Sequence, residues 1–263
     1  MSKVAKQLES LRQRIFSCNE PEDPASHLQR LNVIQSEELF DLDFFGDSFG
    51  EGCLELMQAL SQSGIAPYIR SLILRSPDEG ANGTLSWDLE PMLEAEVSFS
   101  NLESVSIQQN KPGDHNCSII GAEYEEDGVI AKLLEQAPRL AELTIPSAPS
   151  ARFFEVGARP LQFLSVDAGF DTQDFILNLA KSTCFPQLSC FEWGEYHETD
   201  MEDYSERCTA IESFRELFAS KSFSPVSRFV WRNPVCDDEQ IEELKQLKPG
   251  LEVLVIRTAA YYV

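Results

Sequence analysis

The chain has 263 residues, of which 43% are hydrophobic and 25% charged, a composition typical of a globular protein with a substantial core. It carries 44 acidic against 21 basic residues, a formal net charge of −23 at pH 7. A surface this negative repels phosphate backbones and anionic membranes, so we expect no nucleic acid and no membrane partner, whereas a basic protein partner is favoured.

The cysteines and the N-terminal segment predict a cytoplasmic protein. Seven cysteines are present, and no two have C-x-x-C spacing, so reduced and mostly buried thiols are expected. The segment MSKVAKQLESLRQRIF lacks the apolar core of a signal peptide. The sequence has no run of ~18 consecutive apolar residues, so no membrane-spanning helix is predicted.

The first predicted element is an amphipathic helix at residues 3–16, where Val4, Leu8, Leu11 and Ile15 recur at helical spacing. The stretch NEPEDPAS at 19–26 ends it and is predicted to be a loop. We therefore divide the chain into an N-terminal capping helix and loop at 1–38 and a main domain at 39–263.

From residue 39 onward, eight segments follow the pattern L-x-x-L-x-L, with apolar residues at the first, fourth and sixth positions. They begin at residues 39, 69, 102, 140, 161, 188, 226 and 251, so consecutive segments lie 21 to 38 residues apart. ESVSIQ, AELTIP and FLSVDA alternate apolar with polar or small residues, which predicts strands with one buried and one wet face. A doubly wound sheet, buried on both faces, would show near-continuous apolar runs instead.

Helix-like stretches lie between most of these strands, at 53–64, 126–137, 171–182, 210–220 and 237–247. Asp171 or Thr172 is a predicted N-cap, and so is Asp237. The step from 140 to 161 is too short for a full helix and is predicted to hold a turn. Strands alternating with helices on one face only predict an open solenoid.

The P-x-L-x-x-L-x-[IVW] segments resemble leucine-rich repeats, and their spacing is most similar to the ribonuclease-inhibitor-like class. The resemblance covers about residues 39–257. FPQLSCFEWGEY, IRSLIL, LEPML and NLESVSI are similar to bacterial cytoplasmic leucine-rich repeat proteins with no assigned activity. The resemblance implies an α/β solenoid, or horseshoe, of about eight degenerate repeats, with parallel strands on the concave face and helices on the convex face. The ladder position of the repeat is Asn only at Asn110, so we expect irregular curvature.

One motif suggests catalysis. In LDFFGDSFG at 42–50, a G-x-S-x-G turn follows a predicted strand and precedes a predicted helix, the context of a nucleophilic serine. It also resembles the first block of the SGNH esterases, which would need an Asp-x-x-His near the C-terminus. The three histidines, His27, His115 and His197, are preceded at that spacing by Pro24, Pro112 and Gly194. We therefore interpret Ser48 as part of a turn, and an esterase using Ser48 remains the alternative.

No metal or cofactor site is expected. DHNC at 114–117 and the acidic residues around His197 lack the ligand spacing of a zinc site, and no phosphate-binding glycine motif is present. The acidic run at 195–206 and the stretch at 108–128 interrupt the pattern as insertions. Tyr196 and Tyr204 make the acidic run a candidate binding loop.

We predict a non-enzymatic protein–protein interaction module, such as a scaffold, an adaptor or an immunity-type inhibitor of a basic toxin. It would bind through the concave face, formed by the third, fifth and seventh positions of each segment, and through the long loops. Phe163 and other apolar residues among charges on that face favour a partner, and these others are Ile73, Val230, Val253 and Val255. Arg228, Arg232 and Arg257 are predicted neighbours there that anchor the carboxylates of an unknown protein partner.

Overall fold

The computed structural model describes residues 2–19, 28–78, 83–94, 97–111, 113–121, 126–195 and 202–258. Within them the chain is a mixed α/β protein with one large, mostly parallel sheet. Strands β1 and β2 pair antiparallel, and every later pair in the nine-stranded sheet is parallel. In spatial order the strands are β1 (Arg30–Ser36), β2 (Leu39–Phe45), β3 (Ile69–Arg75), β5 (Ser104–Ile107), β7 (Glu142–Ile145), β8 (Phe163–Asp167), β9 (Cys190–Gly194), β10 (Arg228–Arg232) and β11 (Glu252–Ile256).

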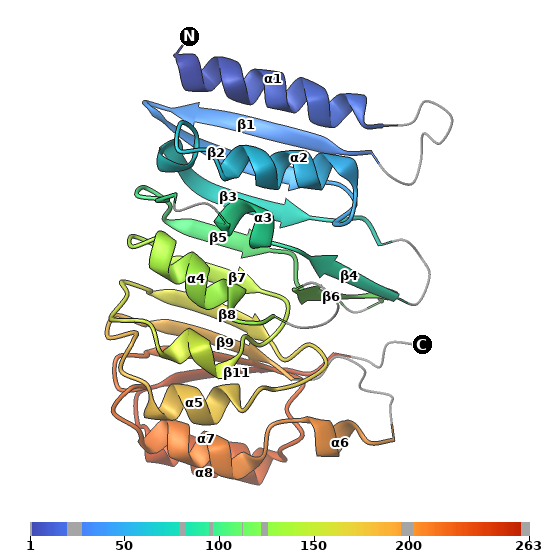
Figure 1. Cartoon of the computed structure of the whole chain (residues 1–263). Coiled ribbons are helices and arrows are strands. Elements are labelled where there is room, and N and C mark those ends of the chain that lie inside the picture. Colours follow the sequence, from blue (N-terminus) through green and yellow to red (C-terminus); the bar gives the residue numbers. More distant parts are fainter. Residues whose placement is uncertain are drawn as a thin grey trace.

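A second sheet of two parallel strands, β4 (Gly83–Trp87) and β6 (Asn116–Ile120), lies in the connections after β3 and β5. Figure 1 shows it on the side where the parallel strands of the main sheet end. All five residues of β6 are buried, so this small sheet packs into the molecule.

The helices form one layer on one face of the main sheet (Figure 1). Each contacts the next along the stack, and none of the described helices is both long and apolar enough to cross a lipid bilayer. We call this the helix-covered face, and we call the opposite one, behind the sheet in Figure 1, the open face. The layer consists of α1 (Lys3–Ser17), α2 (Glu51–Leu60), α3 (Glu90–Leu93), α4 (Val129–Gln136), the 3-10 turn η2 (Ala151–Phe154), α5 (Phe175–Lys181), α7 (Ile211–Ala219) and α8 (Asp238–Leu247).

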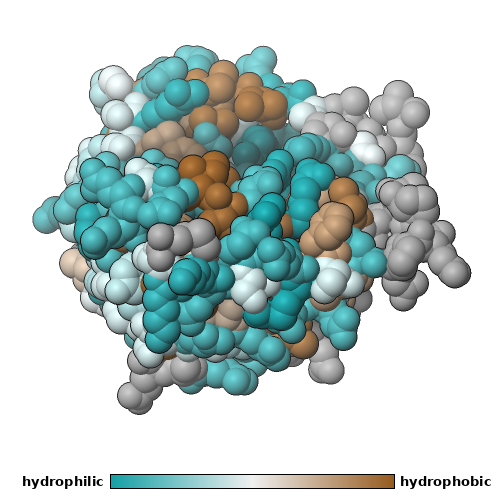
Figure 2. All heavy atoms as spheres, turned by 90° about the horizontal axis from the view of Figure 1, so that it is seen from above, coloured by the Kyte–Doolittle hydropathy of each residue, from teal (hydrophilic) through white to brown (hydrophobic). Residues whose placement is uncertain are grey.

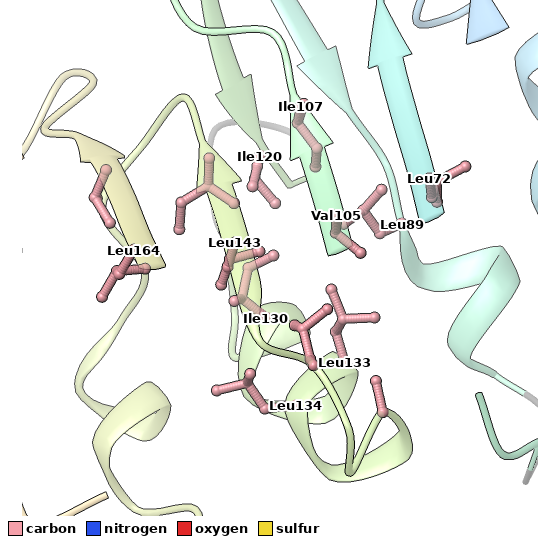
Figure 3. Packing of buried hydrophobic residues seen from close by; sticks show 14 of the residues in the cluster. Leu72, Leu89, Val105, Ile107, Ile120, Ile130, Leu133, Leu134, Leu143 and Leu164 are labelled. Atoms are coloured by element: carbon pink, nitrogen blue, oxygen red, sulfur yellow. The ribbon is translucent and has the colours of Figure 1, made fainter. Parts of the chain in front are cut away.

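Alternation of side chains along each strand builds the core between the sheet and the helices. Leu72, Val105, Leu143 and Leu164 stand side by side on four neighbouring strands, and each is at most 1% exposed. Figure 3 shows them on the side of the sheet that α4 covers with Ile130, Leu133 and Leu134. Toward the C-terminus the same positions become aromatic. There Phe191 of β9 stacks on Phe229 of β10 with ring centroids 5.5 Å apart. Phe175 of the helix α5 stacks on Trp193 of β9 at 5.3 Å.

Each of the eight predicted strand segments contains a strand, and the fourth and sixth positions of the pattern are buried as predicted in β2, β3, β5, β7, β8, β9 and β10. Val230 of β10, predicted to be exposed, is only 4% exposed. The predicted phase of β11 is wrong. Leu254 and Ile256, predicted to be buried, are 41% and 37% exposed, whereas Val253 and Val255 pack against the core. The parallel register explains the reversal, because Val255 lies opposite the buried Trp231 and Ile256 lies opposite Arg232.

Other predictions are confirmed or corrected at the ends of the elements. Asp237 caps α8, accepting from the backbone N–H of Gln240 in a reciprocal capping box. The N-cap of α5 is Asp174 and not Asp171 or Thr172, and the short step between 140 and 161 holds η2. Strand β1 lies in the predicted N-terminal loop. Strands β4 and β6 and the single-turn helices α3 and α6 (Tyr204–Arg207) were also missed.

The packing predicts a large difference between two neighbouring strand positions. Leu143→Ala should lower the free energy of unfolding by about 2–5 kcal/mol, because it leaves a cavity against α4. Ser104→Ala, on the open face of β5, should change it by less than about 0.5 kcal/mol. Urea denaturation followed by circular dichroism measures both, and equal losses would contradict the assignment of the two faces.

Candidate functional site

A groove of about 700 Å³ crosses the open face where β2, β3, β5, β7 and β8 begin. We call it the open-face groove. Its lining is polar and charged, with prolines as the main apolar contribution. The lining residues are Asp41, Arg70, Ser71, Glu103, Ser104, Pro138, Arg139, Ala141, Glu142, Pro160 and Gln162.

The charges in the open-face groove do not balance. Arg70 is held by Asp41 through two donors, with Nε 2.9 Å from Oδ1. Arg139 donates to Glu103 Oε1 at 2.6 Å. Glu142 is exposed and has no ion-pair partner among the described residues. Three carboxylates therefore face two guanidiniums, and the unpaired carboxylate is that of Glu142.

The register of the strands places Glu142 beside an aromatic ring. Glu142 on β7 lies opposite Phe163 on β8, and both side chains belong to the open face. Phe163 is only partly buried. The same row continues through Cys190 to the exposed Arg228. An apolar surface next to an unpaired carboxylate suits a lysine or arginine, whose stem is apolar and whose head is cationic.

In the other half of the open face, the polar side chains of the chain are paired with one another. Arg232 of β10 reaches across β9 to Asp167 of β8 at 2.6 Å and approaches Glu192 at 3.5 Å. The hydroxyl of Ser165 lies 3.1 Å from both Glu192 and Gln109. Burial raises the pKa of Asp167 to about 6, although the neighbouring guanidinium acts in the opposite direction.

Gly194 lies beneath this crossing. A Cβ at that position would stand 2.2 Å from Asp167 Oδ1 and 3.1 Å from Arg232 Nε. Any other residue would therefore displace the ion pair between Arg232 and Asp167. The sequence pattern indicated that Asp167 and Arg232 share a face of the sheet, but nothing in it indicated that they form an ion pair.

The three predicted arginines are not neighbours on one face. Arg232 is on the open face, but Arg257 turns toward the helix-covered side, where it donates to the carbonyl of Cys236 and to Asp238. The prediction that Arg257 lies beside Arg232 is wrong, because the phase of β11 is reversed. Arg228 is exposed on the open face without an ion-pair partner among the described residues. A role of the three in partner binding stays a prediction.

Ser48 lies in a turn whose glycines leave room for the side chain of Gln29. The side chain of the buried Gln29 packs on this turn, and its Oε1 accepts from the backbone N–H of Gly52 at 2.9 Å. A Cβ on Gly46, Gly50 or Gly52 would come within 2.4–2.9 Å of Gln29 atoms or of Phe44. The hydroxyl of Ser48 is buried without a hydrogen-bond partner in the described structure. The close packing of Gln29 thus accounts for the glycines of the motif.

The acidic run begins at a buried carboxylate. Glu195 accepts from Trp231 Nε1 at 3.1 Å and from the backbone N–H of Thr209 at 2.9 Å, which ties the two ends of the excursion together. Burial raises its pKa to about 7. Tyr204 is partly buried and donates to the carbonyl of Asn233. Tyr196 and His197 lie outside the described residues.

His115 is in hydrogen-bond contact with Asp78, and His27 lies outside the described residues. Nδ1 of His115 lies 2.9 Å from Asp78 Oδ2, and the backbone N–H of His115 donates to Asp78 Oδ1. In the part of the chain that the structure describes, no three His, Cys, Asp or Glu residues are grouped to hold a metal ion.

Comparison with known proteins adds no relative. No family model matches the chain, and neither the curated proteins nor the solved structures contain a significant match. The geometry of the site is therefore the basis for any functional conclusion.

The network around Gly194 predicts a local loss of stability. Gly194→Ala should lower the free energy of unfolding by on the order of 1–3 kcal/mol, because the added methyl group overpacks the crossing of Arg232 and Asp167. Gly64→Ala is the matched control, since a Cβ there meets nothing within 4 Å. Urea denaturation curves would contradict this account if the two variants lost the same amount.

The buried carboxyl group of Glu195 predicts a pH dependence. Its pKa rises from an ordinary value of 4.5 to about 7 on folding, so its contribution to stability is lost as the pH rises between those values. Glu195→Gln, which cannot ionise, should gain on the order of 1–3 kcal/mol relative to wild type between pH 5 and pH 8.

Denaturation at both pH values measures this gain. A constant offset between Glu195→Gln and wild type across the range would contradict the prediction. Glu216→Gln, an exposed change on α7, should show no such drift.

Proposed function

We propose that the protein is a non-enzymatic interaction module of the leucine-rich repeat type, which binds a basic segment of a protein partner through its open face. The observation that carries this proposal is the unpaired carboxylate of Glu142 beside Phe163, on a sheet face that carries no helix. Eight strands that follow each other in chain order across the sheet support the solenoid interpretation, with the open face as its concave side.

The chemistry of the partner follows from charge. The chain carries −23, and the open-face groove adds an unbalanced carboxylate, so a segment rich in lysine or arginine gains from both. The arginines in the groove are already bound to Asp41 and Glu103, which leaves few donors for an acidic segment. All seven cysteines are free thiols, which supports our proposal of a cytoplasmic location.

The proposal is tested by selecting phage-displayed random peptides on the wild-type protein. Recovered peptides should be enriched in lysine and arginine. They should bind Glu142→Lys about tenfold or more weakly than wild type, because the change replaces attraction by repulsion. Glu216→Lys, the same substitution on the helix-covered side, should bind like wild type. Acidic peptides, or equal affinity for wild type and Glu142→Lys, would contradict the proposal.

The alternative is a serine esterase built on Ser48, and a fluorophosphonate probe separates it from the binding module. The hydroxyl of Ser48 is buried and donates no hydrogen bond to a described base, so we expect no labelling. Labelling that disappears in Ser48→Ala would favour the esterase.

A further inference from the structure

The last strand of the main sheet, β11, forms an edge with only β10 beside it among the described strands. The backbone N–H of Glu252, at the start of β11, donates to the carbonyl of Ser227, just before β10, at 2.9 Å. Backbone groups of successive residues in a strand point to opposite sides, so those of Val253 and Val255 point away from β10. A row of N–H and C=O groups at a sheet edge is a template for pairing with another strand.

The side chains at this edge are largely apolar. Leu254 and Ile256 are 41% and 37% exposed on the open face. On the other side, Val253 and Val255 pack against the core and are only partly buried. Leu247, in the last turn of α8, is 45% exposed. Exposed apolar side chains gathered at one edge indicate a surface for association.

The opposite edge of the sheet, at β1, is protected. α1 packs against β1, and the exposed residues of β1 are polar or charged apart from Ile34. Figure 2 looks onto this end of the molecule, where the surface is mostly hydrophilic with separate hydrophobic patches. Native sheets prevent edge pairing with covering helices and with polar or charged side chains. No helix follows β11 in the described chain, which makes β11 the edge available for pairing.

The helix next to this edge has a charge pattern that complements itself. α8 is the last helix of the layer and carries Asp238 and Glu239 in its first turn and Lys245 in its last turn. The ion pairs of Asp238 with Arg257 and of Lys245 with Glu242 are exposed and therefore weak. A two-fold axis perpendicular to the sheet places two copies of α8 antiparallel, with the acidic start of each toward the basic end of the other. The charge pattern of α8 thus favours a second copy of this chain as the partner of β11.

We propose that β11 pairs antiparallel with β11 of a second copy, in a two-fold dimer that continues the main sheet from one protomer into the other. With the axis at Leu254, Val253 of each protomer lies opposite Val255 of its partner, and their outward N–H and C=O groups exchange hydrogen bonds. The two Leu254 side chains meet on the open face and shield each other from water. The open-face groove lies at β2, β3, β5, β7 and β8 and stays free in this dimer, so the dimer does not rest on the proposed function.

The net charge of the chain opposes this association, because two copies at −23 repel each other. At ~0.15 M salt the Debye length is ~8 Å, so charges remote from the edge are largely screened. We therefore expect the dimer to be tighter at physiological salt than at low salt.

Size-exclusion chromatography of the full chain with light-scattering detection, at physiological salt and increasing protein concentration, tests the proposal. The mass should rise from the chain mass of 29.6 kDa toward twice that value. A mass that stays at that of the monomer up to submillimolar concentration would overturn the proposal. Slow hydrogen exchange of the Val253 and Val255 amides in such a monomer would show that the chain itself covers the edge.

A charge at the axis should break the dimer. Leu254→Lys should raise its dissociation constant about tenfold or more, because two like charges then lie directly opposite each other. The melting temperature of the monomer should change little, since this side chain is exposed. Ile34→Lys is the matched control on the β1 edge, where the side chain is 62% exposed, and it should leave the dimer unchanged. An equal effect of the two variants, or no effect of Leu254→Lys, would show that the copies associate elsewhere and would overturn the pairing.

A cysteine at the axis tests the register. In Leu254→Cys the two new thiols lie on directly opposite residues with Cα atoms about 4.5 Å apart, within reach of a disulfide. Mild oxidation should therefore link this variant into dimers on a non-reducing gel faster than wild type, whose seven cysteines are free thiols. Ile256→Cys is the control, because its position lies opposite Glu252 of the partner. No link in Leu254→Cys, or one that forms as fast in Ile256→Cys, would overturn the pairing about Leu254.

Discussion

The structure depends on one constraint, which is that the parallel strands of the main sheet point their alternate apolar side chains to the same side. Leu72, Val105, Leu143 and Leu164 stand in one row because the parallel register aligns them. The helices pack on that row and on its aromatic continuation at Phe191 and Phe229. Since the helices cover only this face, the other positions of each strand are left to polar contacts and to solvent.

This division also determines which part of the open face is accessible. Toward the ends of β8, β9 and β10, Arg232 crosses over Gly194 to reach Asp167, and Gln109 approaches Ser165. The chain thus satisfies its own polar groups there. Toward the beginnings of the strands such cross-bracing is incomplete, and Glu142 and Arg228 remain unpaired among the described residues. The surface available to a partner is therefore the row near the strand starts.

Much of the fold could be predicted from hydrophobic periodicity. The L-x-x-L-x-L pattern located eight strands, because each has two apolar residues at alternating positions facing the helices. Strands β1, β4 and β6 lack this pattern, since the first is a largely exposed edge strand and the other two pair only with each other. The phase of β11 could not be read from its own residues, because EVLVI is apolar on both faces and only pairing with Trp231 decides it.

The candidate site was less predictable. Phe163 and Arg228 could be assigned to the open face from strand alternation, but ion pairs depend on contacts between distant segments. Arg70 meets Asp41 from 29 positions away, and Arg232 meets Asp167 from 65. The motif around Ser48 suggested a catalytic turn, and only the position of Gln29 explains its glycines.

Hydroxyl-radical footprinting of the protein with a selected basic peptide bound tests the central claim most directly. The account predicts that the peptide protects Phe163 and the prolines of the open-face groove, Pro138 and Pro160, while exposed side chains of α5 and α7 react as in the free protein. Protection confined to the helix-covered side, with Phe163 reacting as in the free protein, would contradict the claim that the open face is the binding surface.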